Sequence, residues 1–148
     1  MALDNKAKEN NDEALQGNEK IEQAIHMLQK EPTQELLAHV LTVIRRRMKE
    51  NGQLIVSVEP AISSTQLGVE VMQLENGTKW WPVFTSFDEE IRGGGSVKST
   101  FMADMGQLFR AALQAEGIEG LILNPWNRTI MLDKSLLSII LGEPTQGN

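Results

Sequence analysis

The chain contains no cysteine among its 148 residues. Disulfide bonds, thiolate metal ligands and thiol nucleophiles are therefore excluded. Its two histidines offer little material for a zinc site or a histidine-based catalytic triad. No run of 18 apolar residues occurs, so the sequence predicts no membrane-spanning helix. We accordingly expect a protein that is not an enzyme, with no catalytic residue, no metal site and no cofactor.

Aromatic and basic residues are also scarce. The chain has three Trp, four Phe and no Tyr, and its 14 Lys and Arg face 20 Asp and Glu, for a formal net charge of −6. An acidic balance of this kind argues against nucleic-acid binding. Residues 1–17 are polar and lack the apolar segment of a signal peptide. We expect a cytoplasmic protein that binds neither nucleic acid nor membrane.

The hydrophobic pattern divides the chain into one domain with two tails. Residues 1–18 hold too few apolar side chains to offset the entropy cost of ordering, which predicts a flexible polar tail. Residues 19–142 form the predicted domain, and residues 143–148 a short C-terminal tail. Apolar residues at helical spacing predict helices over residues 18–31 and 33–50, capped by Asn18 and Thr33.

The rest of the domain alternates strands and helices. Strands are predicted over residues 53–58, 66–74, 79–86, 120–123 and 129–132, and Asn76-Gly77 predicts a hairpin turn. Pro82 predicts that its strand lies at a sheet edge or bulges there. Helices are expected over residues 87–91, from Ser99 or Thr100 to Gly117, and over 134–141. This order predicts an α+β fold, with a mostly antiparallel sheet of about five strands covered by helices and two N-terminal helices.

Several polar clusters resemble functional motifs, but their context favours structural roles. His26 and His39 point away from the buried stripes of their predicted helices. The loop over residues 93–100 has Val97 where a phosphate-binding loop requires glycine before the lysine. Residues 45–47, three consecutive arginines, are expected to form a solvated helix end, and residues 88–90, three consecutive acids, a solvated helix start.

The tryptophans are the most informative side chains. Trp80 and Trp81 are neighbours on one strand and must face opposite sides of the sheet. Trp126 lies in a predicted turn, where a large ring either covers a core edge or meets a partner. The crowding of aromatic residues between positions 80 and 126 therefore predicts an interaction surface there.

Two motifs and their order resemble a known family. The motifs are residues 81–86 (WPVFTS), followed by an acidic turn, and residues 120–126 (GLILNPW), with a helix around Leu108-Phe109 between them. Together with the preceding helices and the closing helix, they are similar to the N-terminal domain of the SseB (enhanced serine sensitivity) family over about residues 18–142. The resemblance implies a bacterial protein without an established catalytic activity. On this resemblance we expect the chain to lack the second domain that longer family members carry.

The residues and the resemblance together predict a non-enzymatic SseB-like protein-interaction module with an unidentified protein partner. The alternative is a small-ligand or amino-acid-binding domain, related to serine. A type III secretion-associated protein and an enzyme are the remaining alternatives, the latter requiring Asp88 or Glu89 to lie near Asp133. A homo-oligomer stays open. The predicted partner or ligand surface comprises Trp80, Phe84, Thr85, Ser86, Asn124, Trp126 and Arg128.

Overall fold

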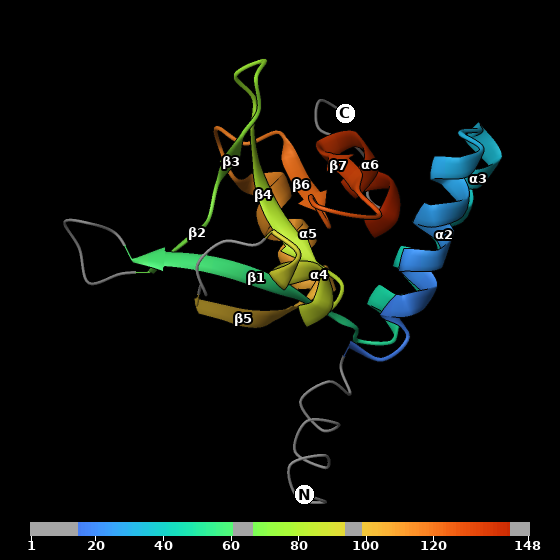
Figure 1. The fold of residues 1–148 in the computed structure, drawn as a ribbon. Coiled ribbons are helices and arrows are strands. Elements are labelled where there is room, and N and C mark those ends of the chain that lie inside the picture. Colours follow the sequence, from blue (N-terminus) through green and yellow to red (C-terminus); the bar gives the residue numbers. More distant parts are fainter. Residues whose placement is uncertain (1–14, 61–66, 94–98, 143–148) are drawn as a thin grey trace, which may run out of the picture.

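A computed structural model describes residues 15–60, 67–93 and 99–142 (Figure 1). Its helices are α2 (Asn18–Lys30), α3 (Gln34–Lys49), α4 (Phe87–Ile91), α5 (Met105–Gln114) and α6 (Lys134–Leu141). Its strands are β1 (Gln53–Pro60), β2 (Leu67–Val69), β3 (Met72–Gln73), β4 (Lys79–Phe84), β5 (Ser99–Asp104), β6 (Gly120–Leu123) and β7 (Ile130–Asp133). The described part of the chain contains no helix that is long and apolar enough to cross a membrane.

The strands form one mixed sheet. Its main path is β2-β1-β4-β6-β7, with β3 paired to β4 and β5 paired to β1. Within the described residues β4 and β6 are parallel, and all the other neighbours are antiparallel. The predicted α+β fold with a mostly antiparallel sheet and two N-terminal helices is thus confirmed.

Local sequence signals explain most of the element boundaries. Thr33 Oγ1 accepts a hydrogen bond of 3.1 Å from the Leu36 backbone N–H and so caps α3. Asn51, with a φ of 65°, follows the end of α3 in the left-handed region, which asparagine tolerates better than most residues. The turn between β3 and β4 is centred on Asn76-Gly77 as predicted, and Leu74 N donates to Thr78 O across it.

The main core lies between one face of the sheet and the helices α2, α3, α5 and α6, which lie on the same side of the sheet (Figure 1). Its fully buried side chains include Ile44, Phe109, Leu121, Leu132 and Leu137. The opposite face carries a smaller cluster of Leu15, Ile55 and Phe84, against which Met102 packs. Leu15 and Asn18, assigned to the tail by sequence, are therefore buried parts of the fold. Residues 1–14 and 143–148 lie outside the described residues.

The prediction for residues 99–104 was wrong. These residues form β5, which pairs with β1 over its whole length, and the helix begins only at Met105. Asp104 caps that helix, since its Oδ2 accepts a hydrogen bond of 3.1 Å from Gln107 N. Phe101 and Met102 fit the helical spacing that continues into α5, but pairing with β1 provides backbone hydrogen bonds that the sequence pattern does not reveal.

Pro82 does not mark a sheet edge, because β4 lies between β1 and β6. Carbonyls of Lys79 and Val83 accept hydrogen bonds from the segment containing β6, so the backbone nitrogen of Pro82 faces the other side. On that side β4 pairs with β3 at Trp80 and with β1 from Val83 onward. Pro82, which has no N–H, therefore lies where the partner of β4 changes from β3 to β1. At this point the loss of one hydrogen bond between strands is tolerated.

Candidate functional site: a groove between α2 and α4

The candidate site begins at the adjacent carboxyl ends of the parallel strands β4 and β6. Thr85 directly follows β4 and Asn124 directly follows β6, so strand pairing brings the two residues together. Thr85 N donates to Asn124 Oδ1 over 2.9 Å, and Asn124 Nδ2 donates to Thr85 Oγ1 over 3.0 Å. Both residues are fully buried. Their polar groups are therefore committed to each other and fix the chain where it leaves the sheet.

A carboxylate from α2 joins this pair. Thr85 Oγ1 donates to Glu22 Oε2 over 2.5 Å, and Arg128 Nη1 donates to Glu22 Oε1 over 3.3 Å. Asn124 and Arg128 have φ values of 52° and 51°, in the left-handed region. From this turn after β6 the Asn124 side chain contacts Thr85, and the Arg128 side chain reaches Glu22 on α2. Of the predicted site residues, the structure joins Thr85, Asn124 and Arg128 in one network, with Glu22 as an additional member.

Asn18 and Arg47 extend the polar contacts toward α3. Asn18 Nδ2 donates to the carbonyls of Gln53 and Thr85 over 2.9 and 3.1 Å, while its Oδ1 accepts from Arg47 Nε over 3.0 Å. The predicted cap role of Asn18 is wrong, because Gly17 occupies the N-cap position of α2. Arg47 was expected to be solvated but is buried. Its guanidinium contacts Asn18, which lies 29 positions away in the chain and which no local pattern places nearby.

Glu89 is the second polar residue whose expected exposure was wrong. Its backbone N–H donates to Ser86 Oγ over 3.2 Å, so Ser86 caps α4, and its Oε2 accepts from Asn127 Nδ2 over 3.0 Å. Its Oε1 lies 3.9 Å from Arg92 Nε and accepts no hydrogen bond from the described residues. Burial raises the pKa of the Glu89 carboxyl, and the nearby Glu22 carboxylate adds to this shift.

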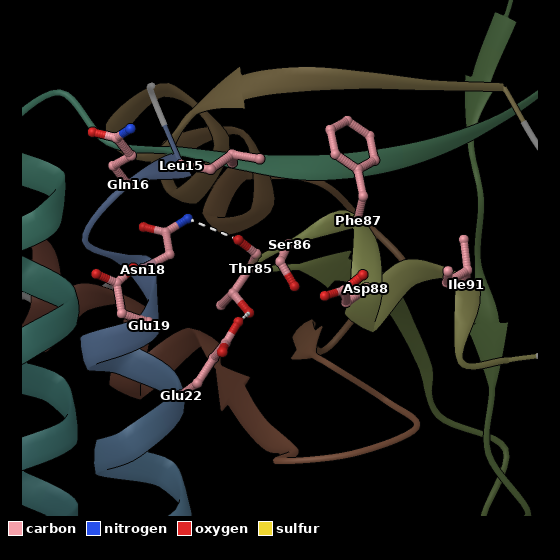
Figure 2. Close-up of a pocket in the computed structure, with 10 residues that line it drawn as sticks. All are labelled: Leu15, Gln16, Asn18, Glu19, Glu22, Thr85, Ser86, Phe87, Asp88 and Ile91. Carbon is pink, nitrogen blue, oxygen red and sulfur yellow. Dashed lines mark hydrogen bonds between the residues drawn. The ribbon is translucent and has the colours of Figure 1, made fainter. Parts of the chain in front are cut away.

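A groove opens beside this network, between the start of α2 and α4 (Figure 2). Its volume is about 620 Å³, and we call it the α2–α4 groove. Thr85 and Ser86 lie between its two sides (Figure 2). It is lined by Leu15, Gln16, Asn18, Glu19, Glu22, Thr85, Ser86, Phe87, Asp88 and Ile91. Among the residues that the structure describes, the lining combines three carboxylates with three apolar side chains and contains no lysine, arginine or histidine.

The aromatic candidates do not share one surface. Trp80 is only 7% exposed, at the opposite end of β4 from Thr85, and its Nε1 donates to Thr78 Oγ1 over 2.9 Å. Trp81 packs against the main core, and Phe84 is buried on the other face. Trp126 is 49% exposed, and a Cβ added at Gly93 would lie 2.6 Å from its Nε1. Its indole therefore covers Gly93, just beyond α4.

The remaining polar candidates lie apart from the groove. His26 and His39 are exposed, as expected. Asp133 caps α6 by accepting a hydrogen bond of 2.9 Å from Leu136 N, and it pairs with Gly120 at the amino end of β6. It thus lies at the end of β6 opposite Asn124, away from Asp88 and Glu89. Gly94 to Lys98 of the glycine-rich loop lie outside the described residues.

Comparison of the chain with protein-family models, with curated proteins and with solved structures found no match. The resemblance to the SseB family therefore stays a prediction that rests on residues 81–86 and 120–126. The site is interpreted below from its own geometry.

Sequence reasoning missed Asn18, Glu22, Arg47 and Glu89 as members of the polar network. Glu22 follows the buried Ile21 and so lies beside the buried face of α2. That position was the one available signal, because a carboxylate at the margin of a buried stripe must find a donor nearby. The other contacts join residues that are 29 to 67 positions apart, and no local pattern predicts them.

Proposed function

We propose that this chain is a non-enzymatic, SseB-like protein-interaction module of the bacterial cytoplasm. In this proposal the α2–α4 groove binds a short segment of a partner protein, in which a basic side chain is flanked by apolar ones. The observation that carries the proposal is the composition of the groove, which is acidic and apolar at once.

The charge of the groove selects a basic partner. Glu22 is paired with Arg128, but neither Glu19 nor Asp88 forms an ion pair with any residue that the structure describes. Both side chains lie on exposed residues at the two sides of the groove (Figure 2). A lysine or arginine of the partner would meet one or both carboxylates. Such complementarity favours the correct partner and accelerates encounter more than it adds affinity.

Apolar contacts supply the remaining binding free energy. Phe87 and Ile91 are one helical turn apart in α4, and they are 40% and 66% exposed. Burying part of these side chains would contribute at about 25 cal/mol per Å² of apolar surface removed from water. Leu15, which is 7% exposed, lines the opposite side of the groove. An apolar partner side chain on either flank of the basic residue would contact these groups.

The network behind the groove has a positioning role. The Thr85 hydroxyl and the Asn124 amide are already hydrogen-bonded to each other, and the Thr85 hydroxyl also donates to Glu22. They hold Ser86 and the start of α4 in place, so a partner need not contact them. Thr85, Asn124 and Arg128 are thus positioning residues in this proposal, whereas Glu19, Phe87, Asp88 and Ile91 make the contacts.

Short synthetic peptides test the proposal directly. One set carries an arginine between leucine and phenylalanine, and a matched set carries glutamate in its place. We expect the arginine set alone to bind, with affinity that falls as salt screens the carboxylates. Amide chemical shifts should change at residues 85–91 and at Leu15. Equal binding of both sets, or shifts confined to residues outside the groove, would contradict the proposal.

Variants locate the charge contacts. Glu19→Gln and Asp88→Asn should each weaken binding of the arginine peptide about two- to fivefold, the usual range for an exposed ion pair. Glu116→Gln serves as the matched control, since Glu116 is an exposed carboxylate outside the groove. An equal effect of the control variant would show that overall charge, rather than the groove, attracts the peptide.

The second candidate is a groove for a free amino acid, which its volume would accommodate. The lining is less suited to that ligand, because a free amino acid carries a carboxylate and the described lining residues include no basic side chain to bind it. A thermal-shift screen of amino acids separates the two candidates. A ligand at 100 times its Kd stabilises the folded state by about 2.7 kcal/mol.

A further inference from the structure

Strand β5 forms an edge of the sheet. It pairs with β1 from Ser99 to Asp104, and the described residues place no strand on its other side (Figure 1). Edge strands are usually protected by charged side chains, lysine above all, by proline, by a bulge or by a very short length. The sequence of β5, STFMAD, contains neither lysine nor proline, its six residues pair without a bulge, and its one charged residue is Asp104 at the end of the strand. Phe101 on this strand is 46% exposed. The strand is therefore suited to pairing with another strand.

The register identifies the backbone groups that are available for such pairing. Met105 N donates to Gly52 O over 3.0 Å, in continuation of the β1–β5 register. Along an antiparallel strand, the backbone N–H and C=O groups of successive residues point to opposite sides. Since the N–H of Met105 points toward β1, the N–H and C=O groups of Phe101 and Ala103 also point toward β1. The N–H and C=O groups of Thr100 and Met102 and the N–H of Asp104 consequently point toward the open edge, whereas the Asp104 carbonyl, at the N-cap position of α5, accepts the first hydrogen bond of that helix.

We propose that a second copy of this chain pairs with β5 through its own β5, in antiparallel orientation, about a two-fold axis at Met102. Met102 then lies opposite Met102 of the second copy, and Thr100 lies opposite Asp104 in both directions. In this register Met102 exchanges both backbone hydrogen bonds with Met102 of the other copy, and the Asp104 N–H of each copy donates to the Thr100 C=O of the other. The two sheets become one continuous sheet.

Side-chain chemistry supports this register over its neighbours. The Thr100 hydroxyl faces the Asp104 carboxylate of the second copy and is able to donate a hydrogen bond to it. A shift that centred the axis on Asp104 would bring two like charges together, which is unfavourable. Phe101 lies opposite Ala103, whose small side chain leaves room for the exposed ring. One strand per copy gives a small contact area, so the dimer is expected to depend on concentration.

The absence of native cysteine allows a clean cross-linking test in the full chain. In Met102→Cys the two Cα atoms would lie about 5.5 Å apart, which is within the range of a disulfide bond. We expect rapid disulfide dimers under mild oxidation, and at least about tenfold slower cross-linking of Phe101→Cys and Met131→Cys. Phe101→Cys tests the register, because in the proposed pairing Phe101 lies opposite Ala103 and not opposite Phe101 of the second copy. Met131→Cys is the control for random collisions, because Met131 is an exposed residue of β7. Equal rates for Phe101→Cys and Met102→Cys, or no cross-linking of Met102→Cys, would overturn the proposal.

A charge pair provides an independent test by sedimentation equilibrium. Thr100→Asp would place two carboxylates opposite each other at two symmetric positions, and dimer affinity should fall about tenfold. Adding Asp104→Asn should restore dimerisation, because asparagine removes the repulsion and still caps α5. Thr100→Asn alone should leave the dimer intact. A wild-type chain that stays monomeric at every concentration, or a double variant no better than Thr100→Asp, would contradict this pairing.

Discussion

Arg47 Nε donates a hydrogen bond of 3.0 Å to Asn18 Oδ1, and Asn18 in turn donates to the carbonyls of Gln53 and Thr85. One buried amide thereby connects α2, α3, the start of β1 and the end of β4. Because Thr85 lies between the two sides of the α2–α4 groove, this contact also determines how α2 is placed relative to α4. The stability of the fold and the shape of the groove depend on the same side chain.

Asn18→Ala should destabilise the protein strongly. The change leaves two backbone carbonyls and the Arg47 guanidinium without the Asn18 partner, and a buried unsatisfied polar group costs about 1–3 kcal/mol. We expect a loss of about 3 kcal/mol in the free energy of unfolding, measured by urea denaturation. Gln29→Ala, at an exposed position of α2, is the matched control and should change stability little. A small effect of Asn18→Ala would show that the network adds no stability.

Asn124 has two roles, since its side chain bonds to Thr85 and its backbone adopts the left-handed conformation. Two substitutions separate these roles. Asn124→Gly removes the hydrogen bonds to Thr85 but keeps the left-handed conformation accessible. Asn124→Ala removes the same bonds and adds conformational strain at a φ of 52°. We therefore expect alanine to be less stable than glycine by about 1 kcal/mol in thermal unfolding. Equal stabilities would imply that the turn relaxes out of the left-handed region when the side chain is lost.

The buried Glu89 carboxyl should make stability depend on pH. Its pKa in the folded state is raised by burial, so in the unfolded state it loses its proton at lower pH. Below the ordinary carboxyl pKa both states are protonated and the folded state has no penalty. As pH rises through the interval up to the raised pKa, stability is lost, and the loss is complete above it.

Glu89→Gln should remove this component of the pH dependence. The difference in unfolding free energy between wild type and variant should then favour wild type most at low pH and decline as pH rises. Chemical denaturation across the acidic range measures it. Glu90→Gln, on the same helix, provides the control and should leave the slope unchanged. A parallel pH profile for wild type and Glu89→Gln would show that the carboxyl is not penalised by burial.

Trp126 should be the main solvent-accessible fluorophore. It is half exposed, whereas Trp80 is buried and Trp81 packs on the core. Trp126→Phe should remove most of the acrylamide-quenchable emission and change stability by less than about 0.5 kcal/mol. Trp80→Phe should instead cost about 1 kcal/mol, because the hydrogen bond to Thr78 is lost. Strong quenching that persists in Trp126→Phe would place another indole in solvent.

Local signals predicted elements well wherever caps, turns and periodicity act within a few residues. Thr33, Asn76-Gly77 and Gly142 mark a helix start, a hairpin turn and a helix end that the structure contains, the last with a φ of 73°. The α+β class followed from their order. The same reasoning failed at residues 99–104, where an apolar spacing compatible with a helix is overridden by pairing with β1.

The candidate site could be predicted only in part. The sequence nominates Thr85, Ser86, Asn124 and Arg128 as polar groups at the ends of predicted strands, and the structure joins Thr85, Asn124 and Arg128 in one network with Glu22. Trp80 was selected as an aromatic residue, but the sequence cannot show that its ring is buried. The sequence does not predict the α2–α4 groove, since its two sides come from segments more than 60 residues apart in the chain.

By itself, the sequence determined what chemistry is available and where most helices and strands begin and end. The lack of cysteine, the small number of histidines and the acidic charge are properties of composition and need no fold. Only the tertiary structure decided that Arg47 and Glu89 are buried, that Pro82 lies inside the sheet and that β5 forms an edge. Each of these outcomes depends on a partner from a distant segment, because burial and strand pairing are set by long-range contacts rather than by neighbours in sequence.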